Sequence, residues 1–470
     1  MLLVATMAVA VVAAGCAIGP NYHRPSAPTP QEYSELGGWK PITPKDTLDR
    51  GAWWSVYGDP DLDRLETQVS ISNQNVKAYE AQYAQALALV RVVRSELFPS
   101  IGVNGQATRG RSASAGLATG APATAGGVTN AFQADGTASW TLDVWGSIRR
   151  QLESQKAAAQ VSGADLANAL LSAQATLASD YFSLRAADAL TDILAESVTG
   201  YERTAQITEN QYHFGTASRG DFMAARAQVE ATRAQLIALR QTRGQYEHAI
   251  AVLTGALPSG FTIAHGGLAV PVPVVPVGVP SALLERNPSI AAAERQMQSQ
   301  SALIGVAEAA FFPDVTLSGL VGFASSTMSH LVSAPNRVWS ASGTVAGTVL
   351  DVGGKVGAVA AARAGYAQAV ANYRQTVLST FQTVEDQLLA LHTLQDEAVA
   401  AKAAVDAAQE AADVALNEYK AGTVIFTTVI VANQTYLADR QALLTIQQNR
   451  LLASVALIQV LGGGWESPRG

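Results

Sequence analysis

The stretch "FQADGTASWTLDV", residues 132–144, decides the fold because apolar and polar side chains alternate along its whole length. One set of alternate positions is apolar or small, and the other set is polar throughout. Successive side chains of a β-strand point to opposite faces of the sheet, so this strand would have one apolar and one polar face. Its length and period are typical of a transmembrane strand with one face to lipid and the other to a water-filled lumen.

The polar positions of this strand are the candidates for lining such a lumen: Gln133, Asp135, Thr137, Ser139 and Thr141. The alternative is an amphipathic strand in a soluble β-sandwich. Strands of that kind usually run for about five or six residues, which is shorter than the alternation seen here. The pattern therefore favours a membrane strand.

The chain contains two copies of one pattern. Three segments return in the same order: "LFPSIGVNG" (97–105) as "FFPDVTLSG" (311–319), "LDVWG" (142–146) as "LDVGG" (350–354), and "NQYHFGT" (210–216) as "NEYKAGT" (417–423). The corresponding phenylalanines, leucines and asparagines are separated by 214, 208 and 207 residues. A segment of roughly 200 residues is therefore duplicated.

Each copy predicts a helix, two strands joined by a loop, a very long helix, a glycine-containing turn and a second helix. The first helices are expected at about 60–96 and about 281–310, with Asp59 and Asn287 as N-caps before prolines. In 338–350 the apolar alternation and the repeat of 132–144 disagree in phase. The sequence leaves a bulge and a gap as alternative explanations.

The long helices are expected at about 147–212 and about 355–420, and neither range contains a proline. Asp143 and Asp351 precede them and are expected to cap them. At about 1.5 Å per residue each helix would reach on the order of 100 Å. Apolar residues in the second range follow the 4-3-4-3 spacing of a coiled coil, from Val377 to Leu391. A long antiparallel bundle and the wall of a helical tube both fit this pattern.

The two copies together supply four strands, which cannot close a membrane barrel because the smallest such barrels have about eight. Two or more chains would therefore have to combine. Three chains would give about twelve strands and a lumen, and their helices would continue the tube.

Charge and composition exclude several classes of protein. The formal net charge is −7 and no Lys/Arg-rich run is present, so the chain has no electrostatic footprint for nucleic acid. The six histidines and the single cysteine show no metal-ligand spacing, and no catalytic constellation emerges. Beyond residue 16 no run of 18 apolar residues occurs, so a membrane crossing would have to use strands.

The N-terminal stretch "MLLVATMAVAVVAAGC" is uncharged and apolar and ends in small residues, which is typical of a secretion signal, although no Lys or Arg precedes it. Residues 1–15 are assigned to that signal and 16–58 to an extended N-terminal segment. The remaining divisions are the first copy (59–264), a proline-rich linker (265–280), the second copy (281–464) and a tail (465–470).

The chain resembles the TolC-like outer-membrane factor family over nearly its whole length, and most closely its lipid-anchored NodT-type branch. Six segments carry the resemblance: "GCAIGPNYHRP" (15–25), "WWSVYGDPDLDRL" (53–65), "LDVWG", "VPSALLERNPSIAAAERQM" (279–297), "IGVAEAAFFPDVTLSG" (304–319) and "TIQQNRLLASVALIQVLGGGW" (445–465). The resemblance implies an α+β homotrimer with a twelve-stranded β-barrel in the outer membrane, four strands per chain, continued by a long α-helical barrel in the periplasm.

The implied function is that of a passive duct in a tripartite efflux pump, which exports small molecules such as drugs and has no enzyme activity. The implied partners are a periplasmic adaptor (membrane fusion) protein, an inner-membrane resistance-nodulation-division (RND) pump and outer-membrane lipid. "AAGC" then becomes a lipobox, in which Cys16 is the first mature residue and carries a diacylglycerol thioether and an N-terminal acyl group. No other cofactor is implied.

The turns between the long helices and their partners are the expected periplasmic tips and the natural gate of such a duct. Gly215 and Gly422 suit the left-handed position that ends a helix. By its place in the family pattern, Asp221 would contribute to an acidic ring, whereas Thr428 stands where many relatives have aspartate. Tyr212, Arg219 and Tyr419 are candidates for contacts that lock the gate. A helix-start role is the simpler interpretation of Asp221.

Three other functions compete with the efflux duct. A conduit for protein (type I) secretion would use the same membrane, but the implied anchor disfavours it. A periplasmic coiled-coil lipoprotein without a pore would not need the alternation at 132–144. An outer-membrane enzyme is the weakest of the three.

Overall fold

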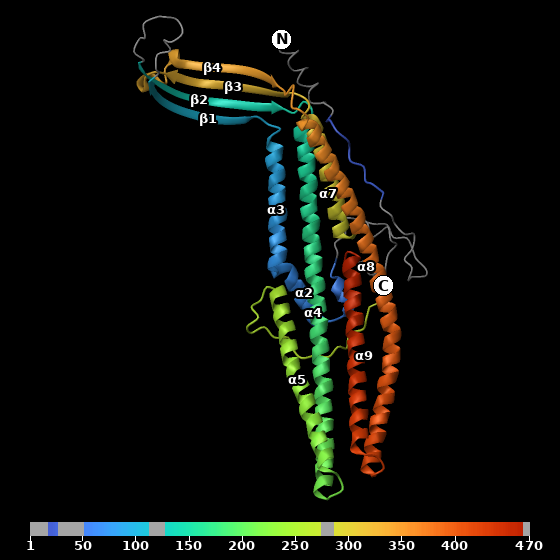
Figure 1. Cartoon of the computed structure of the whole chain (residues 1–470). Coiled ribbons are helices and arrows are strands. Elements are labelled where there is room, and N and C mark those ends of the chain that lie inside the picture. Colours follow the sequence, from blue (N-terminus) through green and yellow to red (C-terminus); the bar gives the residue numbers. More distant parts are fainter. Residues whose placement is uncertain (1–16, 27–50, 112–126, 274–285, 464–470) are drawn as a thin grey trace. The chain divides into compact units, whose positions relative to one another are not determined.

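The structure is a computed structural model and describes residues 17–26, 51–111, 127–273 and 286–463 (Figure 1). It divides into two compact units. Unit 1 comprises Met1–Ser26, Tyr83–Ser162 and Ala293–Tyr373, and unit 2 comprises Ala27–Gln82, Gly163–Ala292 and Arg374–Gly470. Each unit takes segments from both copies, so the units do not coincide with the repeats at 59–264 and 281–464.

Unit 1 contains one antiparallel sheet of four strands in the order β1-β2-β3-β4 (Figure 1). The strands are β1 (Ser100–Arg111), β2 (Val128–Leu142), β3 (Asp314–Ser325) and β4 (Arg337–Ala346). The two inner strands, β2 and β3, come from different copies. The predicted α+β class with four strands per chain is confirmed.

The pairing of the strands explains the disagreement in phase at 338–350. Val103 lies opposite Gly136, and the repeat counterpart of Val103, Leu317, lies opposite Gly343. Gly343 follows Gly136 by 207 residues, whereas Leu350 follows Leu142 by 208. The extra residue therefore lies after β4 ends at Ala346, and the explanation is a gap outside the strand.

The first predicted helix, 60–96, is instead two helices, α2 (Pro60–Ser72) and α3 (Gln74–Ser95). Asp59 caps α2 as predicted, accepting hydrogen bonds from the amides of Asp61 and Leu62. Asn73 separates the two helices because its backbone is extended, with φ −62° and ψ 121°, and its side chain caps the start of α3. Its Oδ1 accepts from the amides of Asn75 and Val76 at 2.9 and 3.1 Å, and its Nδ2 donates to the carbonyl of Leu253 at 2.8 Å.

The second copy repeats this arrangement at the start of α7 (Pro288–Ala309). Asn287 Oδ1 accepts from the amides of Ser289 and Ile290, and Asn287 Nδ2 donates to the carbonyl of Val460 at 2.8 Å. The repeat counterpart of Asn287 is therefore Asn73 and not Asp59, although both predicted caps form.

Each copy ends in a helical hairpin, and the two hairpins match in length. The helices are α4 (Ser147–His213) with α5 (Arg219–Leu253), and α8 (Gly354–Lys420) with α9 (Phe426–Val460). The long helices have 67 residues each and the shorter ones 35 each. Asp143 and Asp351 cap the long helices as predicted, since their carboxylates accept from backbone amides at the helix starts.

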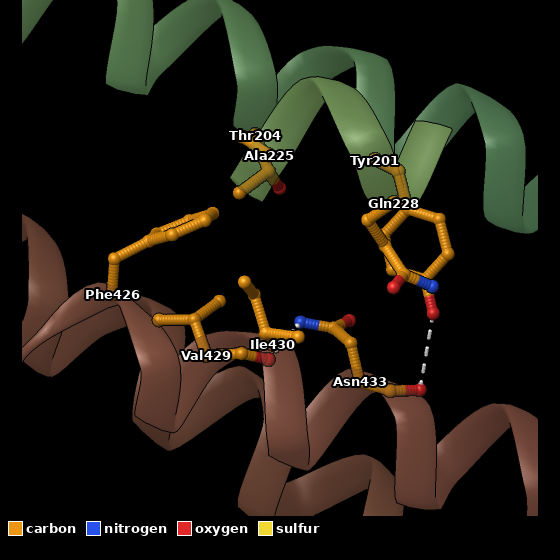
Figure 2. A pocket seen from close by; sticks show the side chains of 8 residues that line it. All are labelled: Tyr201, Thr204, Ala225, Gln228, Phe426, Val429, Ile430 and Asn433. Carbon is orange, nitrogen blue, oxygen red and sulfur yellow. Dashed lines mark hydrogen bonds between the residues drawn. The ribbon is translucent and has the colours of Figure 1, made fainter. Parts of the chain in front are cut away.

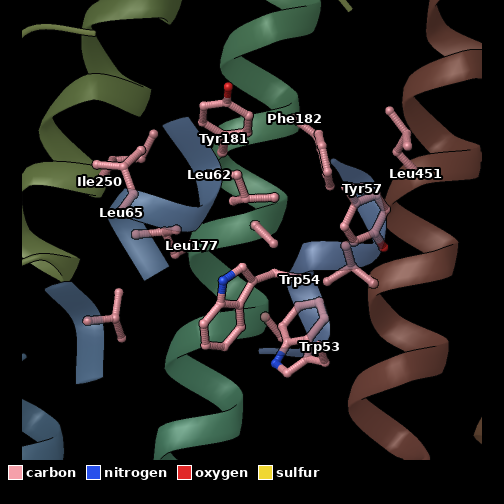
Figure 3. Close-up of a cluster of buried hydrophobic side chains, with 14 of the residues drawn as sticks. Trp53, Trp54, Tyr57, Leu62, Leu65, Leu177, Tyr181, Phe182, Ile250 and Leu451 are labelled. Carbon is pink, nitrogen blue, oxygen red and sulfur yellow. The ribbon is translucent and has the colours of Figure 1, made fainter. Parts of the chain in front are cut away.

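The core of unit 2 forms where α2 packs against the hairpin helices (Figure 3). It includes Leu62 and Leu65 of α2, Tyr181 and Phe182 of α4, and Leu451 of α9. A 3-10 helix, η1 (Trp53–Tyr57), adds three aromatic side chains to this core. The assignment of 16–58 to an extended segment is therefore wrong at its end, because burial of the aromatic rings holds 53–57 in a helical turn.

Two further 3-10 turns, η2 (Met328–His330) and η3 (Ala334–Asn336), join β3 to β4. Among the helices of the described ranges, none combines the length and the apolar character that a membrane crossing requires.

Candidate functional site

One face of the sheet in unit 1 is apolar and exposed along most of its length, with arginine and asparagine side chains at the end farthest from the long helices. Ile101 and Val103 of β1 are 82% and 91% exposed, and Trp339 of β4 is 75% exposed. The strand pairing places these residues on the same face as Phe132 and Trp140 of β2. A soluble single chain rarely exposes a contiguous apolar surface of this kind. The face is suited to contact with lipid or with another apolar surface.

The opposite face carries the five polar residues predicted to line a lumen, Gln133, Asp135, Thr137, Ser139 and Thr141, because they alternate with the apolar set along β2. Neighbouring strands continue it with Asn104 and Gln106 of β1, Thr316 and Ser318 of β3, and Ser340, Ser342 and Thr344 of β4. Polar side chains thus occur on this side of all four strands, and Leu320 of β3, opposite Thr137, is the large apolar exception.

Asp135 is the buried member of this polar face, at 3% exposed. Its Oδ1 accepts a hydrogen bond from Gln133 Nε2 at 2.8 Å. Gly322 of β3 lies opposite it, and a Cβ at that position would come within 2.6 Å of the Asp135 Cβ. A glycine is therefore required for the strands to approach this closely around the carboxylate.

Both outer strands have one unpaired edge within the described residues. β1 pairs with β2 alone and β4 pairs with β3 alone. Each edge presents backbone N–H and C=O groups that could pair with a further strand. The two edges belong to different strands. A second chain could therefore pair its β4 with β1 of the first chain and leave an edge free for a third chain.

The hairpin tips of unit 2 have the geometry predicted for them. Gly215 and Gly422 have φ angles of 78° and 77°. In the first tip the amide of Thr216 donates to the carbonyl of Gln211, and in the second Thr423 donates to Glu418. These are the bonds of a Schellman motif, in which a glycine in the left-handed region ends the helix.

Asp221 lies at the start of α5 and forms a capping box with Ser218. The Ser218 hydroxyl accepts from the Asp221 amide at 3.0 Å, and the Asp221 carboxylate accepts from the Ser218 amide at 3.2 Å. The helix-start interpretation of Asp221 is thereby confirmed, and its charge remains exposed at the tip. In the second copy Thr428 replaces Asp221 and Ile425 replaces Ser218, and α9 begins with no side-chain cap.

The three residues named for a gate lock form no ion pair within the described residues. Tyr212 stacks on Phe222 with ring centroids 5.9 Å apart, and Arg219 has no acidic partner there. Tyr419 is buried against Phe426, with centroids 5.2 Å apart. Burial raises the pKa of Tyr419, and the charge of Asp221 raises it further. An ionic lock within one chain is therefore absent from this part of the structure.

The two hairpins instead meet through neutral side chains just beyond the tips (Figure 2). A small cavity of about 10 Å³ lies between them, with eight lining residues: Tyr201, Thr204, Ala225, Gln228, Phe426, Val429, Ile430 and Asn433. Phe426 and Val429 are buried there, and the Tyr201 hydroxyl donates to the carbonyl of Asn433 at 3.3 Å. Farther along, Arg440 pairs with Glu196 at 2.7 Å.

This contact between the hairpins was not predicted from the sequence, although the differences between the two copies contain a signal for it. Phe426, Asn433 and Leu437 occupy the positions that Arg219, Arg226 and Glu230 occupy in the first copy, 207 residues earlier. Three charged residues are thus replaced by apolar or neutral ones along one face of α9. Such a difference between copies indicates a face that is buried in only one of them.

The remaining predicted features concern ligands. In the described residues, no group of three or more His, Cys, Asp or Glu side chains is placed to hold a metal ion. Cys16, the predicted lipid attachment site, lies outside the described residues, as does residue 274 onward of the predicted linker.

Comparison with known proteins places this geometry in a family. The sequence model described as "Outer membrane efflux protein" matches residues 67–256 and 279–463, which is most of the chain and part of both copies. The toluene efflux pump outer membrane protein TtgC of Pseudomonas putida is 27% identical over 98% of this chain and 95% of its own length. The cation efflux system protein CusC of Escherichia coli is 26% identical over 97% of this chain and 98% of its own length.

Solved structures agree with this assignment. The outer-membrane channel OprN is 28% identical and superimposes with a TM-score of 0.87 over 96% of this chain and 100% of that channel. The open state of the MtrE outer membrane channel of Neisseria gonorrhoeae shares the fold, with a TM-score of 0.83 over 96% of this chain and 98% of that one at 24% identity. The chain belongs to the outer membrane efflux protein family.

Proposed function

We propose that three copies of this chain close their sheets into one twelve-stranded barrel in the outer membrane. Closure would pair β4 of each chain with β1 of the next chain. Each chain contributes four antiparallel strands, which is an even number, so the pairing between chains is also antiparallel around the ring. Because lipid offers no hydrogen bonds, the unpaired edges of β1 and β4 cannot stay open there.

The observation that carries the proposal is the difference between the two faces of the sheet. The apolar face with Ile101, Val103 and Trp339 would face lipid, and the polar face with Asp135 and Thr137 would line a water-filled passage. In a closed barrel these two environments are separated by a single strand thickness. The helical hairpins of the three chains would form the periplasmic part of the passage.

The gate would lie at the hairpin tips. Phe426 and Val429 would hold the second hairpin against the first by apolar contact, and the exposed carboxylate of Asp221 would supply one negative charge per chain at the entrance. Opening would then require the two hairpins to separate at the cavity between them (Figure 2). At the tips no ion pair between the described residues of the two hairpins would have to break, although the Arg440–Glu196 pair joins the hairpins farther along.

The partners would be a periplasmic adaptor protein and an inner-membrane RND pump, which would supply the energy. Phe214 and Ile425 are exposed at the two tips and could contact the adaptor. The chain itself would be a passive duct without catalysis. Since the curated relatives are named for efflux of antibiotics, toluene and cations, the exported substances would be small molecules. A lipid on Cys16 would add a second attachment to the membrane.

Reconstitution of the purified protein into planar bilayers, together with its native mass, tests the duct and the trimer. We expect cation-selective conductance steps, at least after conditions that open the gate, and a mass of three chains. A single-chain mass, or a bilayer without conductance under every opening condition, would contradict the proposal.

A further inference from the structure

Residues 17–26, called here the N-terminal strap, have no helix or strand of their own but bind to the rest of unit 1. The amide of Ile18 donates to the carbonyl of Trp145 at 3.1 Å, at the turn between β2 and α4. The strap therefore begins its course where the sheet ends and the long helix starts.

Arg150, in the first turn of α4, holds the strap most directly. Its Nε donates to the carbonyl of Ile18 at 3.1 Å, and its Nη2 donates to the carbonyl of Gly19 at 3.1 Å and to Asn21 Oδ1 at 2.9 Å. Its Nη1 donates to Glu153 at 2.8 Å. Arg150 is only 5% exposed, and a buried guanidinium is stable only when its donors are satisfied. The strap supplies most of the acceptors.

Two glycines make room for the strap. A Cβ at Gly305 of α7 would lie 2.7 Å from the carbonyl oxygen of Ile18 and 3.0 Å from Arg150 Cγ. A Cβ at Gly146 would lie 2.7 Å from the Ala17 Cα. Larger residues at either position would collide with the backbone of the strap.

The far end of the strap is also bound. Arg24 forms an ion pair with Glu294 of α7 at 3.1 Å. The Tyr22 hydroxyl is buried beside the same carboxylate, and burial together with the charge of Glu294 raises the pKa of Tyr22 to about 12. Contacts at both ends thus fix the course of the strap along unit 1.

The duplication shows that this binding is not a consequence of the shared fold. Gly357 occupies the position of Arg150 in the second copy, 207 residues later, and Arg91 occupies the position of Gly305 in the first copy, 214 residues earlier. Neither counterpart could make these contacts. Arg150 and Gly305 have no equivalent residue in the other copy, and the N-terminal segment that they contact also occurs once in the chain.

We propose that Arg150 and Gly305 form a socket that holds the N-terminal strap and fixes the place where the N-terminal end of the mature chain leaves the protein. The role of the socket in anchoring rests on the proposed function, in which Cys16, the residue directly before Ala17, carries a lipid. With a lipid on Cys16, the socket sets the height of the membrane anchor relative to the sheet. Arg150 is then a positioning residue for the anchor.

Hydrogen–deuterium exchange of the full-length protein in detergent, followed by mass spectrometry, tests the socket. We expect slow exchange in the peptide that contains Ile18, and exchange faster by at least about tenfold in Arg150→Ala and in Gly305→Leu. Lys156→Ala, at an exposed position on the same helix, should leave the strap protected. Wild-type exchange of the strap in both socket variants would overturn the proposal.

Two controls separate the socket from folding and from lipidation. Peptides from α9 should exchange at the wild-type rate, and if Arg150→Ala fails to fold, Gly305→Ala supplies a smaller change at the same contact. In Cys16→Ser the strap should remain protected; loss of protection there would show that the lipid, and not the socket, holds it. The mass of the N-terminal peptide shows whether the lipid is present. An unlipidated peptide in the wild type would contradict the proposed lipidation of Cys16 but not the socket.

Discussion

At the scale of single residues, Glu66 of α2 is the most unusual ionisable group outside the sheet. It is fully buried, and neither carboxylate oxygen has a hydrogen-bond partner among the described residues. Burial, with a smaller contribution from the charge of Asp63, raises its pKa from 4.5 to about 9. The unfolded chain therefore binds fewer protons than the folded one between these two values, and Glu66 lowers stability as the pH rises through that window.

Glu66→Gln should stabilise the protein at neutral and alkaline pH, because the amide is neutral at every pH. We expect the free energy of unfolding to rise by up to about 3 kcal/mol at pH 7, with the gain shrinking toward pH 4.5. Thermal unfolding in detergent across this pH range measures the effect. Glu80→Gln, at an exposed position of α3, is the control, and an equal midpoint for Glu66→Gln and wild type at pH 8 would contradict the assignment.

Asp221 combines two roles that a pair of variants can separate. Asp221→Ala removes both the capping box and the charge at the tip, and should raise ion leak and lower cation selectivity by at least about two-fold. Ser218→Ala removes the cap at a cost of about 1 kcal/mol but keeps the charge, so selectivity should not change. Recordings in planar bilayers compare them; identical selectivity in both variants and wild type leaves Asp221 with the capping role alone.

At the scale of elements, the sequence predicts what is periodic and misses what depends on single residues. The long helices were predicted within two residues of Ser147–His213 and Gly354–Lys420, because a proline-free apolar repeat extends over many turns. The break at Asn73 was missed, since it has no proline or glycine and depends on a bond to Leu253 in a distant segment. The phase of β4 was undecidable because the gap lies in a turn without periodicity.

The paired asparagines Asn73 and Asn287 should contribute similarly to stability, because they make the same bonds in the two copies. Replacement of either by alanine removes a helix cap and leaves a carbonyl, of Leu253 or Val460, without its donor. We expect a loss of about 1–3 kcal/mol for each. Thermal unfolding measures the loss. If Asn73→Ala were neutral while Asn287→Ala was costly, the structural equivalence of the two positions would be wrong.

The site itself was predictable only in part. The alternation in 132–144 predicted both faces of β2, and the glycines predicted the helix ends at Gly215 and Gly422. The contact of Phe426 and Val429 with the first hairpin was not predicted, because the position of one hairpin against another depends on tertiary packing. The socket for the N-terminal strap was missed for the same reason, since Arg150 and Gly305 are far apart in sequence.

At the scale of the whole molecule, duplication explains how one sequence pattern builds an outer-membrane efflux protein. Each copy contributes a strand pair and a helical hairpin, and the inner strands β2 and β3 join the copies into one sheet. The copies then diverge where function needs asymmetry, at the hairpin tips and at the N-terminal strap. Membership in the outer membrane efflux protein family agrees with this division, and the twelve-stranded trimer follows from it as a proposal.

Cysteine scanning of β2 in single channels tests most directly whether the polar face of the sheet lines a water-filled pore. Cysteines are introduced one at a time at 133–141, and a positively charged, water-soluble thiol reagent is added during recording. The parent chain, with Cys16 as its only cysteine, is the control. We predict block at Gln133, Thr137, Ser139 and Thr141, little reaction at the buried position of Asp135, and no block at the apolar positions between them. Block without a period of two, or block confined to the apolar positions, would show that the polar face of β2 does not line the pore.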